Sequence, residues 1–196
     1  KDAMKTPASN KEQYDQINLQ WQDAGKRVSE NLGNIIPMAD TSQSMTDDKC
    51  VPFYNSIGLS IRVSEKTNPA FKNRILQFST TANWFDLTTH KTFVDKVNYM
   101  KQHINCGSTN FNGAMKLILD SVLQAELHPS QVNNLVLVVF SDMQINVSPY
   151  TACYDDTLHE SIKKMYASAG LMSKYKAPYE PPHIVFWNLR QTSGFP

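Results

Sequence analysis

Oxygen-bearing side chains stand directly after two apolar runs of the chain. Asp40 ends the first run and is followed by Ser42 and Ser44, and Asp142 follows the second run. Thr109 lies between them in sequence, in a short polar segment that begins with a glycine. Two carboxylates, three hydroxyls and retained water form an oxygen site of the kind that Mg²⁺ or Mn²⁺ accepts. The pattern therefore predicts a site for one divalent cation.

The elements that position these residues follow from apolar periodicity. The runs at 35–40 and 135–140 are almost unbroken, which is typical of strands covered on both faces. Shorter strands are predicted at 74–79, 84–87 and 184–189, and the first two of these form an antiparallel hairpin. Helical spacing predicts helices at residues 51–66, 93–106, 111–125 and 158–169.

This order of elements predicts an α/β fold. We expect a doubly wound, mostly parallel sheet with one antiparallel edge hairpin and helices on both faces. Loops that follow neighbouring parallel strands open at the same edge of such a sheet. Asp40 and Asp142 should therefore meet at the point where the strand order reverses. Pro37 lacks a ladder donor, so it predicts a local irregularity just before the site.

The chain divides into a leader at residues 1–31 and a domain at residues 32–196. Ser9 and Glu12 form a capping-box pattern that predicts the start of a helix. The helix carries an apolar stripe that should pack on the domain or on a preceding one, formed by Tyr14, Ile17, Trp21, Ala24 and Val28.

Composition excludes several functional classes. Nineteen basic residues face 18 acidic ones, and a net charge of +1 favours neither a nucleic-acid surface nor a membrane surface. No apolar run reaches the roughly 20 residues that a membrane-spanning helix needs. Three widely spaced cysteines fit neither a disulfide framework nor a zinc site. These features predict an intracellular, cytoplasmic protein without direct nucleic-acid binding.

The oxygen-bearing residues as a set resemble the metal-ion-dependent adhesion site (MIDAS) of the von Willebrand factor A (vWA) domain. That motif is D-x-S-x-S, then a threonine in a later loop, then an aspartate after a central strand. The resemblance implies that Ser42, Ser44 and Thr109 are hydroxyl ligands, and that Asp40 and Asp142 bind directly or through water.

Two further segments refine the resemblance. The sequences FSDMQ at 140–144 and VFWNLR at 185–190 are most similar to the C-terminal vWA module of an intracellular family of unknown function. The vWA domain of the Ro autoantigen is a more distant analogue. The resemblance also implies a closing strand and helix beyond residue 196. Gln43 stands where the family often has glycine, so a positive φ there would strain the loop.

Three functions follow from these observations. The first is a binding module whose Mg²⁺ or Mn²⁺ ion is completed by an acidic group of a partner protein, with no catalytic residue. The second is Mg²⁺-dependent phosphoryl transfer with Asp40 as nucleophile, although serine stands where the phosphatase pattern D-x-D has its second aspartate. The third is a metal-free scaffold within a larger, RNA-associated protein, which rests on the Ro analogy.

Overall fold

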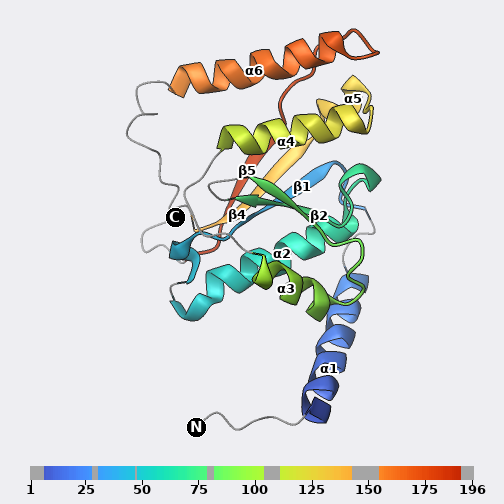
Figure 1. The fold of residues 1–196 in the computed structure, drawn as a ribbon, viewed down its shortest axis with the longest axis vertical. Coiled ribbons are helices and arrows are strands. Elements are labelled where there is room, and N and C mark those ends of the chain that lie inside the picture. Colours follow the sequence, from blue (N-terminus) through green and yellow to red (C-terminus); the bar gives the residue numbers. More distant parts are fainter. Residues whose placement is uncertain are drawn as a thin grey trace.

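A central sheet organises the described part of the molecule (Figure 1). The computed structural model describes residues 7–27, 31–46, 48–78, 82–103, 111–142 and 155–190. Within these residues the strands are β1 (Ile35–Asp40), β2 (Arg74–Phe78), β3 (Asn83–Asp86), β4 (Val136–Ser141) and β5 (His183–Asn188). The strand order is β3-β2-β1-β4-β5, and every neighbouring pair is parallel except β2 with β3.

Helices cover both faces of this sheet (Figure 1). One side carries α4 (Phe111–Gln124), α5 (Pro129–Val132) and α6 (Asp155–Met172). The other side carries α2 (Val51–Lys66) and α3 (Phe93–Gln102), and α1 (Pro7–Lys26) packs against the end of these two helices. The predicted α/β class is confirmed: a mostly parallel sheet with one antiparallel pair and helices around it.

The side chains of β1 alternate between two apolar cores. Met38 points into the core formed with α4 and α6, whereas Ala39 points into the core formed with α2 and α3. β4 lies beside β1 in parallel register from Ile35↔Val136 to Ala39↔Phe140. Because both faces of these strands are covered, their sequences show no polar alternation.

Element boundaries differ from the predictions by a few residues. The helix predicted at 51–66 has those bounds, and α4 begins at Phe111 as expected. α5 was not predicted, because four residues carry too little periodicity to be recognised. Its start is marked by a proline after His128, whose side chain accepts a hydrogen bond from the Ser130 amide. The helix predicted at 93–106 is α3, which ends at Gln102, and residues 104–106 lie outside the described residues.

Pro37 does not interrupt β1. The ladder between β1 and β2 begins one residue later, at Met38↔Leu76, while pairing with β4 runs through Pro37. At the start of β1 the Thr67 hydroxyl donates to the Ile35 carbonyl, in place of a strand partner. The missing N–H of Pro37 is therefore tolerated without the predicted irregularity.

The N-terminal helix differs from its prediction. α1 begins at Pro7, so the Ser9–Glu12 capping box does not start it. Tyr14 and Ile17 are 45% and 41% exposed, and Val28 lies outside the described residues. Of the predicted stripe, Trp21 packs on the domain, whereas Tyr14 and Ile17 do not, and packing of these two residues on a preceding domain stays a prediction.

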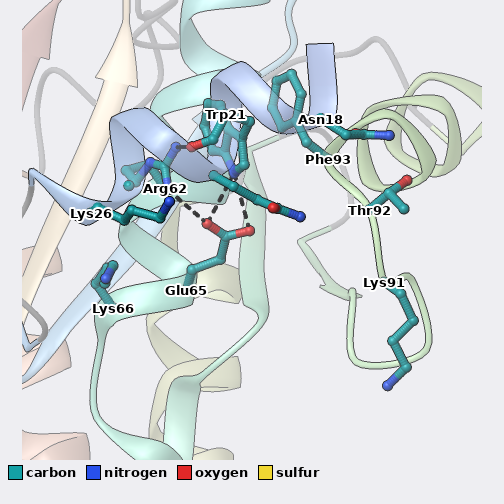
Figure 2. A pocket seen from close by; sticks show the side chains of 11 residues that line it. Asn18, Trp21, Lys26, Arg62, Glu65, Lys66, Lys91, Thr92 and Phe93 are labelled. Atoms are coloured by element: carbon teal, nitrogen blue, oxygen red, sulfur yellow. Dashed lines mark hydrogen bonds and ion pairs between the residues drawn. The ribbon is translucent and has the colours of Figure 1, made fainter. Parts of the chain in front are cut away.

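Trp21 fixes α1 to the domain by stacking on Phe93 of α3 (Figure 2). The two ring centroids are 3.9 Å apart and the ring planes differ by 12°. One turn earlier, the Asn18 side chain accepts a hydrogen bond of 3.1 Å from the Val94 amide in the first turn of α3. An aromatic contact and a capping contact thus join α1 to α3.

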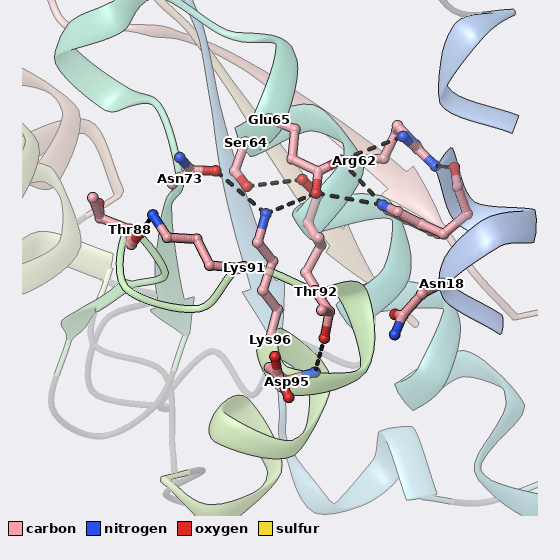
Figure 3. Close-up of polar contacts among 12 residues, drawn as sticks. Asn18, Arg62, Ser64, Glu65, Asn73, Thr88, Lys91, Thr92, Asp95 and Lys96 are labelled. Carbon is pink, nitrogen blue, oxygen red and sulfur yellow. Dashed lines mark hydrogen bonds and ion pairs between the residues drawn. The ribbon is translucent and has the colours of Figure 1, made fainter. Parts of the chain in front are cut away.

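The carboxylate of Glu65 accepts hydrogen bonds from side chains of α1, α2 and α3, next to the stack of Trp21 on Phe93 (Figure 3). It accepts from Trp21 Nε1 at 3.1 Å, from Lys96 Nζ at 2.7 Å and from Arg62 Nη1 at 3.3 Å. The Arg62 guanidinium also lies 3.7 Å from the Trp21 ring centroid and donates to the Trp21 carbonyl. A side chain at Gly25 would collide with the Arg62 guanidinium, since a Cβ there would lie 2.2 Å from Arg62 Nη1.

A cavity of about 530 Å³ lies in this same region, between α1, α2 and the start of α3 (Figure 2). Its lining includes Lys26 and Lys66, which stand at the C-terminal ends of their helices. Cations stabilise the negative end of a helix dipole, so the position of these two lysines is explained by stabilisation of their own helices.

Within the described residues, no helix is both long enough and apolar enough to span a membrane.

We predict that Trp21→Ala lowers the free energy of unfolding by about 2 kcal/mol, because it removes the stack on Phe93 and one donor to Glu65. The measurement is urea unfolding followed by circular dichroism. Leu19→Ala is the matched control, since Leu19 lies on the same helix and is 65% exposed. Equal midpoints for the two variants would contradict the docking role of Trp21.

Candidate metal site

The two predicted carboxylate ligands lie where the strand order of the sheet reverses. From β1 the chain continues through α2 to β2 on one side, and from β4 it continues through α6 to β5 on the other. Asp40 is the last residue of β1, and Asp142 directly follows β4. Both residues are buried, at 2% and 3% exposure. The two carboxylates therefore share one edge of the sheet, as predicted.

Both carboxylate oxygens of Asp40 accept hydrogen bonds. Oδ1 accepts from the Ser42 amide at 2.9 Å, which closes a tight turn directly after the strand. Oδ2 accepts from the Ser141 hydroxyl of β4 at 2.5 Å. Asp40 is thus held by its own loop and by the neighbouring strand, which orients the loop that follows.

A chain of oxygens connects the first strand's loop to Asp142. The 3₁₀ helix Gln43–Thr46 turns the backbone so that Ser44 Oγ lies 3.0 Å from Ser42 Oγ. Ser44 Oγ in turn donates to Asp142 Oδ1 at 3.3 Å. Four of the five predicted ligands therefore lie together: Asp40, Ser42, Ser44 and Asp142.

The spacing of these oxygens suits a small divalent cation. Adjacent ligands of an octahedral Mg²⁺ ion at about 2.1 Å lie about 3.0 Å apart. The distances from Ser44 Oγ to Ser42 Oγ and to Asp142 Oδ1, 3.0 and 3.3 Å, are close to that value. Hydroxyl and carboxylate oxygens are also the ligand type that Mg²⁺ and Mn²⁺ prefer. The residues present therefore fit such an ion.

Thr109, the fifth predicted ligand, lies outside the described residues, so its place at the site stays a prediction. In the part of the chain that the structure describes, no cluster of three or more histidine, cysteine, aspartate or glutamate side chains could hold a metal. A metal at this edge would accordingly depend on serine hydroxyls as well as on the two carboxylates.

Gln43 takes an ordinary backbone conformation. It begins the 3₁₀ helix and is not among the described non-glycine residues with positive φ. The left-handed positions come later, at Lys49 and Cys50, immediately before α2. Glutamine in place of glycine therefore places no strain on the loop between the two serines.

Two buried side chains, those of Gln77 and Met45, contact residues of the site. The Gln77 side chain of β2 donates to Thr41 Oγ1 at 3.3 Å, and Thr41 is fully buried. Met45 is also fully buried, and its sulfur accepts from the Asp142 amide at 3.2 Å. Thr41, Met45 and Asp142 are consequently held in the buried part of this edge.

Arg190 approaches the site from the end of β5. Its Nη1 lies 3.8 Å from Asp142 Oδ2, and its side chain is 28% exposed while that of Asp142 is fully buried. No local pattern joins Arg190 to Asp142, because the two residues are separated by an entire β-α-β crossover. The available signal was topological: the residues after β5 open at the same edge as Asp142.

Comparison with other proteins gives two matches. Residues 34–196 match the model of a family described as a domain of unknown function, DUF7788. Over 184 residues the chain is 28% identical to the uncharacterized protein L728 of Acanthamoeba polyphaga mimivirus. This match covers 92% of the chain but 30% of the viral protein, so the chain spans less than a third of that relative. Neither description names an activity or a ligand.

We predict that Ser141→Ala lowers the free energy of unfolding by about 1–3 kcal/mol, because it removes a donor from the buried carboxylate of Asp40. Thermal or urea unfolding measures the loss. Thr89→Ala removes an exposed hydroxyl in a turn and serves as the control. If the two substitutions cost the same, the bond between Ser141 and Asp40 does not stabilise the edge.

Proposed function

The chain belongs to the DUF7788 family, whose function is unknown, and we propose that its domain is a metal-dependent protein-binding module. The observation that carries the proposal is the hydrogen-bonded chain from Ser42 through Ser44 to Asp142 at the reversal point of the sheet. These oxygens come from two strands that are far apart in sequence. Their convergence supports one shared ligand.

In this proposal the site holds Mg²⁺ or Mn²⁺ in the manner of a vWA domain. Ser42, Ser44 and Thr109 supply hydroxyl oxygens, and Asp40 and Asp142 bind the ion directly or through water. The mostly parallel sheet, with the site between two central strands, supports the vWA-like interpretation of the fold. The ion would supply a hard positive centre with an open position for an oxygen ligand.

The partner in this proposal is a protein that presents an acidic side chain. A carboxylate is a hard oxygen donor, so it can complete the coordination of a cation that protein ligands leave open. The near-neutral charge of the chain supports recognition at one local point rather than over a broad surface. We place this interaction inside the cell, because the odd number of spaced cysteines suits a reducing compartment.

The hydrogen bonds of Asp40 favour binding over phosphoryl transfer. A nucleophilic carboxylate needs an oxygen that can approach phosphorus. In Asp40, Oδ1 accepts from the Ser42 amide and Oδ2 from the Ser141 hydroxyl, and the residue is 2% exposed. These contacts suit a residue that orients a loop, and the proposal accordingly assigns no catalytic role.

We predict that calorimetric titration of the domain with Mn²⁺ gives one binding site, and that Ser42→Ala weakens it by tenfold or more. Ser42 is the better test than either aspartate, because removing a buried carboxylate also changes stability. Asp86→Asn is the control, since it removes a carboxylate at the opposite edge of the sheet, beside Arg74. Absence of Mn²⁺ binding to the folded wild type would reject the metal site.

We further predict metal-dependent capture of a partner. With the domain as bait, a protein should be recovered in Mn²⁺ and lost in chelator, and Ser42→Ala should reduce recovery in proportion to its loss of metal affinity. Mass spectrometry of the two eluates identifies the protein. Equal recovery with and without chelator would contradict a metal-mediated contact.

A further inference from the structure

The two carboxylates of the site carry negative charge in a buried setting. Moving a carboxylate out of water is costly unless donors or cations surround it. For Asp40 the donors are the Ser42 amide and the Ser141 hydroxyl. For Asp142 the surroundings include the Ser44 hydroxyl at Oδ1 and the Arg190 guanidinium at Oδ2. A cation of the chain itself thus stands beside the predicted metal ligand.

The backbone at the end of β5 sets the position of Arg190. The Leu189 amide donates to the Ser141 carbonyl at 2.9 Å, which continues the contact with β4 past the last strand residue. The Arg190 amide donates to Asn188 Oδ1, also at 2.9 Å. These bonds hold the main chain at the end of β5, and from there the Arg190 guanidinium extends toward Asp142.

The contact between Arg190 and Asp142 is suited to displacement. At 3.8 Å the closest nitrogen–oxygen pair is longer than a hydrogen bond, so the attraction is mainly Coulombic. The Arg190 side chain retains 28% exposure, which gives it a path to water. A divalent ion bound by Asp142 would repel the guanidinium across a few ångströms of poorly screened space.

We propose that Arg190 is a tethered competitor of the divalent cation, which compensates the charge of Asp142 until the metal replaces it. The inference rests on the proposed metal site and adds its regulation. Metal binding then changes the contacts of the residue that follows β5, and so couples occupancy of the site to the end of that strand. The competitor also raises the metal concentration at which the site fills.

Calorimetric titration with Mn²⁺ tests the proposal in the wild type and in Arg190→Gln. Removing a partly exposed charge partner should tighten Mn²⁺ binding by about fivefold. Lys174→Gln is the matched control, because it removes the same charge from an exposed lysine paired with Glu126, away from Asp142. Its affinity for Mn²⁺ should equal that of the wild type.

A second measurement follows Arg190 directly. In the wild-type domain, the Nε–Hε resonance of Arg190, assigned by its absence in Arg190→Lys, should shift as Mg²⁺ is added and saturate with the binding curve. The titration itself uses the wild type, and Arg190→Lys, which keeps the positive charge, serves only to assign the resonance, so this readout still tests the proposal if Arg190→Gln fails to fold.

The outcomes distinguish failure of the competitor proposal from failure of the proposed metal site. Tighter Mn²⁺ binding by Arg190→Gln with a shifting Arg190 resonance supports competition. Equal or weaker binding by a folded Arg190→Gln, or a resonance unchanged at saturation, overturns it while leaving the metal site intact. Failure of every folded variant to bind Mn²⁺ overturns both the site and the competitor.

Discussion

The parallel pairing of β1 with β4 is the constraint on which the site depends. Their register ends at Ala39↔Phe140, so the next residue of each strand, Asp40 and Ser141, emerges at the same edge. The bond from the Ser141 hydroxyl to the Asp40 carboxylate is a direct result of that register. A slip by one residue would turn these side chains to the other face of the sheet. Because both strands are covered on two faces, the apolar cores make such a slip costly, and the packing of the sheet thereby specifies the geometry of its polar edge.

At this polar edge, the cost of burying two carboxylates must be offset by neighbouring groups. Two carboxylates at one buried edge repel each other, and each must be offset by donors or cations. Serine hydroxyls donate hydrogen bonds to both carboxylates. A hydroxyl can also offer its oxygen to a cation. Ser44 illustrates the point: it donates to Asp142, and the same oxygen is a predicted metal ligand. An edge of this composition can therefore be stable without an ion and still suit one.

Local patterns predicted the strands of the sheet well and the contacts between residues distant in sequence poorly. Unbroken apolar runs identified β1 and β4, and the residues directly after them, Asp40 and Asp142, were brought together as expected. The partners that hold α1 were missed, although packing by Trp21 was predicted, because they are polar and aromatic residues far away in sequence, such as Glu65. The Ser9–Glu12 capping pattern failed because Pro7 already begins the helix. Arg190 was missed for the same reason as Glu65: no local spacing encodes a contact across a crossover.

The candidate metal site and the hydrogen-bonded contacts of Glu65 lie at opposite ends of α2, so we expect them to act independently. Val51 begins the helix just after the loop of the site, whereas Glu65 stands in its last turn, where α1 docks. Sixteen residues of α-helix extend about 24 Å, well beyond the distance over which substitutions usually couple. The family match begins at residue 34, after α1, and includes all the residues of the candidate site. Contacts of Trp21 and Glu65 should therefore govern how firmly α1 is held, separately from the proposed binding site at the oxygens after β1 and β4.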